Sequence, residues 1–202
     1  MLISTQYKFA FLCMPKAAST SVDSALRPYS EIITRGRYKH MNYRQFERFF
    51  LPLLRARGKA RAIETLCIVR EPIGRLESWY RYRSRLDPNG SGPLGKHSTR
   101  DITFDQFVEA YLSSAPPEFA RIGRQCDFVF NKRGKVGVKR LFALENMERL
   151  AAFLETLLGQ SISIPILNKS PALPINLSPD LTQRLRKALA EDYALYSRAL
   201  EA

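Results

Sequence analysis

FAFLCMPKAASTSVDSAL, residues 9–26, runs from an apolar segment through one lysine and a series of small residues into a helical pattern. The apolar run over residues 6–14 predicts a buried strand, and residues 20–27 predict a helix. Small residues at such a junction let the backbone approach a ligand, and the first N–H groups of a helix lack partners within the helix. The stretch therefore predicts an anion cradle formed by Lys16, Ala17, Ala18, Ser19, Thr20 and Ser21.

Two interpretations of this junction stay open at the level of the residues. The pattern has the chemistry of a phosphate-binding loop, but the motif GxxxxGK[ST] is absent, which disfavours a magnesium-nucleotide site. An ordinary strand–loop–helix junction with a surface lysine and a Ser or Thr N-cap would have the same residues.

The stretch LCIVREPIGRLESWYRYRSR, residues 66–85, repeats the order of strand, cation, proline and helix. Residues 64–70 predict a buried strand, and a helix is expected over 73–86 because Pro72 suits a first turn. Arg70 then lies at the carboxyl end of a strand, where a guanidinium can bind a phosphate through two N–H groups.

Ser78 lies about two helical turns beyond Arg70 and can meet the same ligand only through the fold. The alternative is that Arg70 pairs with Glu71 or Glu77 and that Ser78 is a small packing residue.

The order of elements predicts the fold class. With 202 residues, 45% of them hydrophobic and 25% charged, the chain is expected to form one domain over 1–202. Alternating strands and helices predict an α/β domain with a central, mostly parallel sheet flanked by helices. Ligands bind such sheets outside the carboxyl ends of the strands, where both motifs lie.

Weaker signals predict the remaining elements. A helix is expected over 42–57, where Pro52 is placed to kink or split it, and another after the capping box that begins at Thr103. We further expect a short strand over 136–142 and a helix over 145–158 that ends at Gly159. A last helix is expected from Ser178 to near the C-terminus. Residues 87–101, rich in Gly, Pro, Ser and Asn, predict a loop.

Charge and composition limit the classes of binding partner that the chain is expected to have. The net charge of +13, from 32 Lys and Arg against 19 Asp and Glu, favours anionic partners: nucleic acid, anionic lipid, acidic glycans or nucleotides. Two histidines and three scattered cysteines form no metal-ligand cluster, so no metal is expected, and Cys13 and Cys67 are expected as reduced core thiols. Lys8 interrupts the short apolar run near the N-terminus, so we expect neither a signal peptide nor a membrane span. We therefore expect a cytoplasmic location.

Taken together, the motifs resemble those of the sulfotransferases that use 3′-phosphoadenosine-5′-phosphosulfate (PAPS), and most closely the carbohydrate-type branch. PKAASTS is similar to the 5′-phosphosulfate loop of that family, and VREPIGRLESWY to its 3′-phosphate motif. The departures are mild: Glu71 stands where Asp is commoner, and Ala17-Ala18 replace a pair that often contains Gly. Further similar segments follow in the expected order: KH (39–40), Gln125, LENMERLAAFLETLLG (144–159), LNKS (167–170) and EDYALY (191–196).

The resemblance implies roles for these residues. Lys16 would contact the phosphosulfate and stabilise charge on the leaving oxygen, while the loop over 17–21 would hold the 5′-phosphate. Arg70 and Ser78 would hold the 3′-phosphate. Sulfuryl transfer is an in-line displacement, so positioning and electrostatics can carry it without a metal. The implied reaction is transfer from PAPS to a hydroxyl of a carbohydrate or sugar-bearing acceptor.

The acceptor hydroxyl needs a base. His40 falls where carbohydrate-type relatives often carry a catalytic histidine, and neutral imidazole is a suitable acceptor near pH 7. Glu64 is a second candidate, because some relatives use glutamate. His97 lies in the predicted loop and could contact the acceptor, although a loop histidine needs no such role. The identity of the acceptor, the site of sulfation and the oligomeric state stay open.

Three other interpretations are carried forward. A P-loop-type kinase would need magnesium and prefer ATP, and the missing GK[ST] disfavours it. A basic nucleic-acid-binding protein is suggested by charge and by arginines alternating with Tyr80 and Tyr82, but residues two apart do not share a helical face. A member of the sulfotransferase family that binds the nucleotide without catalysis would keep the same motifs. For the main interpretation, neither a nucleic-acid partner nor a membrane span is expected.

Overall fold

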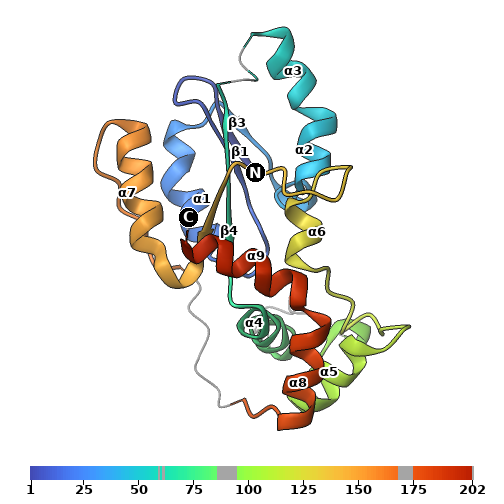
Figure 1. Cartoon of the computed structure of the whole chain (residues 1–202). Coiled ribbons are helices and arrows are strands. Elements are labelled where there is room, and N and C mark those ends of the chain that lie inside the picture. Colours follow the sequence, from blue (N-terminus) through green and yellow to red (C-terminus); the bar gives the residue numbers. More distant parts are fainter. Residues whose placement is uncertain (59, 61, 86–94, 168–174, 202) are drawn as a thin grey trace.

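The computed structural model describes residues 1–58, 60, 62–85, 95–167 and 175–201. It is an α/β structure with a five-stranded sheet flanked by helices (Figure 1). The strands, in their order across the sheet, are β3 (Ile32–Ile33), β1 (Leu2–Ser4), β2 (Phe9–Leu12), β4 (Glu64–Val69) and β5 (Arg140–Ala143).

The sheet is mixed, which corrects the prediction of a mostly parallel sheet. β2, β4 and β5 run parallel, whereas β1 pairs antiparallel with both β2 and β3. The connection between β1 and β2 spans residues 5–8, with Lys8 at a φ of 59°. So short a link can join only antiparallel neighbours, since a parallel pair needs a long crossover.

The strand predictions were best where the apolar run is long. The run over 64–70 is confirmed as β4, and β2 occupies the centre of the run over 6–14. β1 was missed because three residues carry too little periodicity to be recognised. The strand expected over 136–142 lies at 140–143, and Val136 forms an isolated bridge with Phe130 instead.

The helices are α1 (Ser19–Leu26), α2 (Tyr43–Phe49), α3 (Leu51–Ala56), α4 (Pro72–Ser84), α5 (Phe104–Leu112), α6 (Gln125–Val129), α7 (Met147–Leu158), α8 (Pro179–Ala188) and α9 (Ala190–Glu201). Single 3-10 turns lie at Arg27–Tyr29, Gly36–Tyr38, Gly95–His97 and Leu144–Asn146.

Local sequence signals explain several helix ends. Thr103 caps α5 in a reciprocal capping box with Gln106, as predicted, and Gly159 ends α7 at a φ of 70°. The helix expected over 42–57 is divided at Phe50, and Pro52 lies in the first turn of α3. The single last helix was wrong, because the chain breaks at Leu189 into α8 and α9.

Two apolar clusters hold these elements together. The larger surrounds the sheet, where Cys13 and Cys67 are buried thiols, as expected. The smaller lies between α4, α5 and α8, which are grouped at one end of the sheet in Figure 1. Leu181 and Leu185 of α8 belong to this smaller cluster. The end of the sheet next to α4 therefore has its own apolar support.

Among the described residues, none of the helices is both long enough and apolar enough to cross a bilayer.

Candidate anion-binding site

The two predicted anion motifs leave the sheet at the same edge. β2 and β4 are parallel neighbours, with Leu12 opposite Cys67. Their carboxyl ends therefore lie together, and the loop after β2 emerges beside Arg70, which follows β4. Arg75 of α4 connects the two, because its Nε donates to the carbonyl oxygen of Pro15 over 3.3 Å.

The backbone of the loop between β2 and α1 is unusual. Lys16 and Ala18 have φ values of 67° and 51°, in the left-handed region, at a cost of about 1 kcal/mol each. Ala18 is the N-cap of α1 and makes no side-chain capping bond. The Ser or Thr N-cap that the alternative interpretation expected is therefore wrong. The first N–H groups of α1 are not satisfied by a capping side chain, which suits an anion.

The side chains of the loop differ in accessibility. Ala17, Ser19 and Ser21 are buried, whereas Thr20 is exposed. The Oγ of Ser21 accepts a hydrogen bond from the backbone N–H of Leu167 at 3.1 Å. Of the three hydroxyls, that of Thr20 is thus the most open to a ligand.

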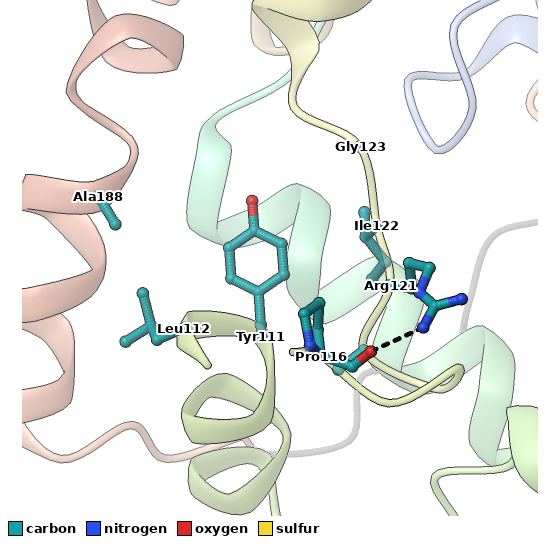
Figure 2. Close-up of a pocket in the computed structure, with 8 residues that line it drawn as sticks. Tyr111, Leu112, Pro116, Arg121, Ile122, Gly123 and Ala188 are labelled. Atoms are coloured by element: carbon teal, nitrogen blue, oxygen red, sulfur yellow. Dashed lines mark hydrogen bonds between the residues drawn. The ribbon is translucent and has the colours of Figure 1, made fainter. Parts of the chain in front are cut away.

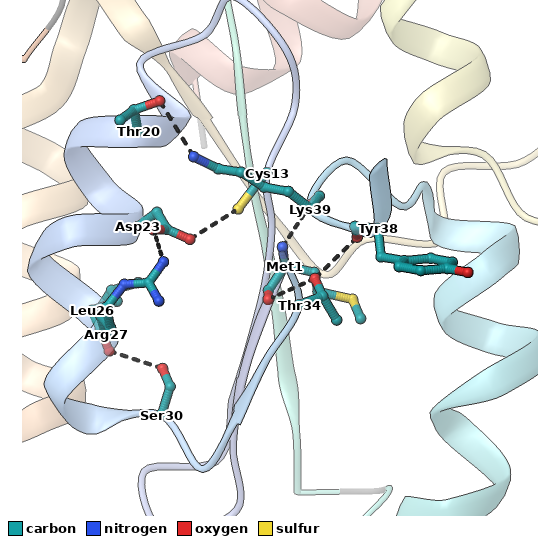
Figure 3. A network of polar contacts seen from close by, with 10 residues as sticks. All are labelled: Met1, Cys13, Thr20, Asp23, Leu26, Arg27, Ser30, Thr34, Tyr38 and Lys39. Atoms are coloured by element: carbon teal, nitrogen blue, oxygen red, sulfur yellow. Dashed lines mark hydrogen bonds and ion pairs between the residues drawn. The ribbon is translucent and has the colours of Figure 1, made fainter. Parts of the chain in front are cut away.

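Further contacts position the segment that carries His40 (Figure 3). The ammonium group of Met1 donates to the carbonyl oxygen of Lys39 at 2.6 Å, and Thr34 bridges the carbonyl oxygens of Met1 and Tyr38. On the other side, Nζ of Lys39 donates to Oγ1 of Thr20 over 3.4 Å. The segment before His40 is thereby attached both to β1 and to the start of α1.

His40 lies next to the anion loop. Its Nδ1 is 2.6 Å from the carbonyl oxygen of Cys13, two residues before Pro15. Since a carbonyl only accepts, this contact assigns the proton to Nδ1 and leaves Nε2 as the basic nitrogen of the neutral ring. Burial lowers the pKa of His40 below the ordinary 6.5, and the positive charges of Lys39 and Lys16 add to that effect. The imidazole is therefore neutral, and able to accept a proton, at neutral pH.

Lys16 points from the loop toward α4. Its Nζ lies 3.4 Å from the centroid of the Tyr82 ring and 5.2 Å from that of Trp79. Burial, together with the positive charges of Arg85, Arg70 and Arg83, lowers the pKa of Lys16 to about 7. The ring faces partly compensate the ammonium charge. Lys16 thus lies in a positive field that an anionic ligand would relieve.

The backbone of Arg70 is held by a buried side chain far away in sequence. Gln125 accepts from the N–H of Arg70 at 2.9 Å and donates to its carbonyl oxygen at 2.8 Å. Gln125 is completely buried, so this pair of bonds fixes the direction in which β4 ends. The side chain of Arg70 is left to extend along α4.

Arg70 and Ser78 face the same side of α4. The Arg70 guanidinium lies against Gly74, because a Cβ built on that glycine would come within 3.5 Å of Nε. Gly74 and Ser78 are one turn apart on that face. Glu77 and Glu71 lie near enough to Arg70 to influence its pKa, although burial lowers that pKa overall. None of the ion pairs found between described residues includes Arg70.

Two buried charged residues that organise the site were missed by sequence reasoning. Arg75 donates to the carbonyl oxygens of Pro15 and Gly123, at 3.3 and 3.0 Å. Asp192 accepts from the N–H groups of Gln125 and Cys126 at 2.9 and 2.8 Å, at the start of α6. The sequence did contain a signal for Arg75. In the predicted helix it lies directly before Leu76 and on the same side as Pro72, which is the side that becomes buried.

Other segments of the family resemblance converge at the same place. Glu71 caps α4 by accepting from the N–H of Gly74, and it also accepts from the Tyr193 hydroxyl, both at 2.5 Å. The N–H of Glu71 donates to Glu145 at 3.2 Å. Gln125 and the segments 144–159 and 191–196 thus all reach the end of β4. Residues 168–170 of the LNKS segment lie outside the described residues.

Glu64 lies at the opposite end of the sheet. It begins β4, whereas Arg70 follows its end, which separates the two by about 20 Å. Its carboxylate accepts from Lys139 at 3.2 Å and from Arg140 at 3.1 Å, and these bonds lower its pKa. The structure does not bring Glu64 together with Lys16, whereas it places His40 beside the anion loop.

The remaining candidates have ordinary surroundings. His97 ends the 3-10 turn Gly95–His97 and is half-buried, while residues 87–94 of the predicted loop lie outside the described residues. Arg81 pairs with Glu77 at 3.3 Å, and Arg83 donates to the carbonyl oxygens of Glu118 and Phe119. Arg83 thus adds to the positive field around Lys16 and fixes α4 to the segment of Glu118 and Phe119.

A pocket of about 360 Å³ lies beside this region and includes none of the predicted site residues (Figure 2). It is lined by Tyr111, Leu112, Pro116, Ala120, Arg121, Ile122, Gly123 and Ala188. The carbonyl oxygen of Gly123 is the one that Arg75 binds, so this pocket and the anion loop share one positioning side chain.

The described residues contain no group of three or more His, Cys, Asp and Glu side chains placed to hold a metal ion. Comparison of the chain with models of protein families, with curated proteins and with solved structures finds no match. The site is therefore interpreted from its own geometry.

Proposed function

We propose that this chain is a PAPS-dependent sulfotransferase with a P-loop-NTPase-like fold. It would transfer the sulfuryl group to a hydroxyl of a carbohydrate or sugar-bearing acceptor, in the cytoplasm. One observation carries the proposal: the loop of Lys16 after β2 and Arg70 after β4 lie at the same edge of the sheet, tied by Arg75. Two anion sites at one edge suit a nucleotide with phosphate groups at both its 3′ and 5′ positions.

The donor would be held at both ends. The N–H groups at the start of α1, with the hydroxyls of Ser19, Thr20 and Ser21, bind the 5′-phosphate side, which carries the sulfuryl group. Arg70 and Ser78, on one face of α4, bind the 3′-phosphate. The 3′ contact distinguishes this donor from ATP and AMP.

The chemistry would follow from the positions of Lys16 and His40. Nε2 of His40 accepts the proton of the acceptor hydroxyl, whose oxygen then forms a bond to sulfur. The bond between sulfur and the bridging oxygen breaks on the opposite side, and Lys16 stabilises the negative charge that develops on that oxygen. The products are the sulfated acceptor and adenosine-3′,5′-bisphosphate. Both side chains lie beside the loop that follows β2.

The polar contacts around the end of β4 support the proposal as well. Gln125, Glu145 and Tyr193 come from segments that resemble the family, and all of them contact Arg70 or Glu71. A surface that bound nucleic acid through charge alone would not need these polar connections between distant segments.

The deciding experiment is calorimetric titration of adenosine-3′,5′-bisphosphate without magnesium. We expect binding by the wild type, a loss of at least about tenfold in Arg70→Ala, and weak binding of AMP. Arg121→Ala, which removes an exposed arginine outside the site, is the matched control and should bind like the wild type. Absence of binding by the wild type would overturn the proposal.

The same titrations separate the rival functions. A kinase would bind ATP only with magnesium, and a nucleic-acid-binding protein would bind duplex DNA with a steep dependence on salt. Binding of the bisphosphate without transfer of labelled sulfate from PAPS to any of a panel of glycans would indicate a nucleotide-binding protein without catalysis.

A further inference from the structure

The segment α2–α3 presents an exposed surface that the proposed reaction does not use. Phe50 N–H donates to the carbonyl of Phe46, and Leu54 N–H to that of Phe50, so the helical path continues from α2 into α3. Phe46 and Leu54 are buried and attach this segment to the core. Figure 1 places α3 at the end of the molecule opposite α4.

The exposed side of this segment is divided into two stripes. At about 100° per residue, one sector contains exposed arginines and the next contains exposed apolar residues. The basic stripe consists of Arg44, Arg48 and Arg55. The apolar stripe consists of Phe49, Pro52, Leu53 and Ala56, and the exposed Gln45 is the polar residue in the same sector.

The apolar stripe exposes large side chains to solvent. Phe49 is 56% exposed and Leu53 is 48% exposed. The two lie one turn apart, so they form a pair rather than isolated surface residues. Two exposed apolar side chains beside a row of arginines match a partner that presents an apolar layer next to an anionic layer.

The charge of the segment selects the partner. Over residues 42–57 the chain has four arginines and one carboxylate, Glu47. The guanidinium of Arg48 lies 5.3 Å from the Phe49 ring, so the two stripes are in contact. An anionic lipid surface offers phosphate groups to the arginines and acyl chains to Phe49 and Leu53 within one turn of helix.

We propose that α2–α3 is a membrane-surface helix that binds anionic lipid, with the apolar stripe inserted below the headgroups. The proposal is independent of the sulfotransferase assignment. Nucleic acid fits less well, because Leu53 and Pro52 offer neither a stacking ring nor a hydrogen bond to a phosphate or a base. Because α4 lies at the opposite end of the sheet, bound lipid would not cover the anion site.

The test is flotation of the full chain with phosphatidylcholine vesicles that contain or lack phosphatidylglycerol. We expect binding only to the anionic vesicles, weakened by salt. Arg44→Gln/Arg48→Gln/Arg55→Gln should lower the affinity by about a hundredfold, at about fivefold for each arginine. Phe49→Ser/Leu53→Ser should lower it by more than about tenfold.

Matched controls separate this surface from general positive charge. Lys132→Gln/Arg133→Gln/Lys135→Gln removes the same number of exposed cations elsewhere and should bind like the wild type. The emission of Phe49→Trp should shift to shorter wavelength on anionic vesicles, because the indole enters a less polar layer. Urea unfolding of each variant checks that the fold is retained.

Three results would overturn the proposal. The first is unchanged binding by Phe49→Ser/Leu53→Ser, because the apolar stripe would then contribute nothing. The second is an equal loss in the Lys132 control, because the charge would then act without regard to position. The third is displacement of the vesicles by duplex DNA, together with a weaker affinity of the arginine variant for that DNA. This result would assign the surface to nucleic acid.

Discussion

Nε of Arg75 donates to the carbonyl oxygen of Pro15 over 3.3 Å, and this bond joins the residue that directly precedes Lys16 to α4. The same guanidinium binds the carbonyl oxygen of Gly123. Arg75 is 6% exposed, so water cannot easily replace either bond. The relative position of the two predicted anion sites therefore depends on a residue that does not itself face the ligand.

Replacement of Arg75 should lower the stability of the fold and also change the ligand preference, and the two effects can be measured separately. Arg75→Met removes the donor to the carbonyl oxygens of half-buried Pro15 and exposed Gly123, which should lower the free energy of unfolding by about 1–2 kcal/mol in urea titrations. As a positioning residue, Arg75 should matter most for the 5′ side of the ligand. The variant should therefore bind adenosine-3′,5′-bisphosphate little better than adenosine-3′-phosphate, a preference that a purely structural role would leave intact. Arg121→Met is the control.

The ammonium of Lys16 should couple nucleotide binding to pH. Its pKa is about 7, and a bound anion favours the charged form and raises that pKa. Affinity for adenosine-3′,5′-bisphosphate should therefore fall as the pH rises above 7, and binding should take up protons there. Titrations in buffers of different ionisation enthalpy measure that uptake. Lys16→Met should lose the uptake above pH 7, and a slope kept in this variant would contradict the assignment.

His40 should affect the rate and not the donor affinity. His40→Ala should lower sulfate transfer by about 10²–10⁴-fold while leaving the dissociation constant for adenosine-3′,5′-bisphosphate within about twofold. Since burial lowers the pKa of His40, the wild-type rate should decline with acid only below pH 6.5. That decline should be absent in His40→Ala. An equal loss of affinity and rate would indicate a structural role for the ring.

Glu64 should matter slightly for stability and not for transfer. Glu64→Gln removes half-exposed ion pairs to Lys139 and Arg140, which should lower the free energy of unfolding by at most about 1 kcal/mol. The folded-state pKa of Glu64 is lowered from 4.5, so its stabilisation is present above that pH. It is lost as the pH falls through the lowered folded value. A large loss of transfer in Glu64→Gln, with stability retained, would restore Glu64 as a candidate base.

Much of the architecture was predictable because its signals are local. The strand over 64–70, the proline-initiated helix after it, the Thr103 capping box and the glycine that ends α7 each depend on a few adjacent residues. The errors fall where the decision is not local. β1 is too short for a pattern, and its antiparallel pairing turned the expected parallel sheet into a mixed one.

In the candidate site, too, the local features were predictable from the sequence and the long-range contacts were not. Lys16, Arg70 and their positions at strand ends follow from the sequence, because a cation after an apolar run is a local pattern. Arg75, Gln125 and Asp192 could not be assigned, since their partners lie 48 to 67 residues away along the chain. The Ser or Thr capping alternative was removed only by the backbone conformation of Ala18.

The sequence by itself determined the long buried strand, most of the longer helices and which cations follow the strands, because short-range periodicity and capping chemistry depend on neighbouring residues. Tertiary structure alone decided that β2 and β4 are neighbours, that both anion motifs share one edge, and that Glu64 lies at the other. Those outcomes depend on strand pairing and on buried polar bonds between distant segments, which form only when the chain packs.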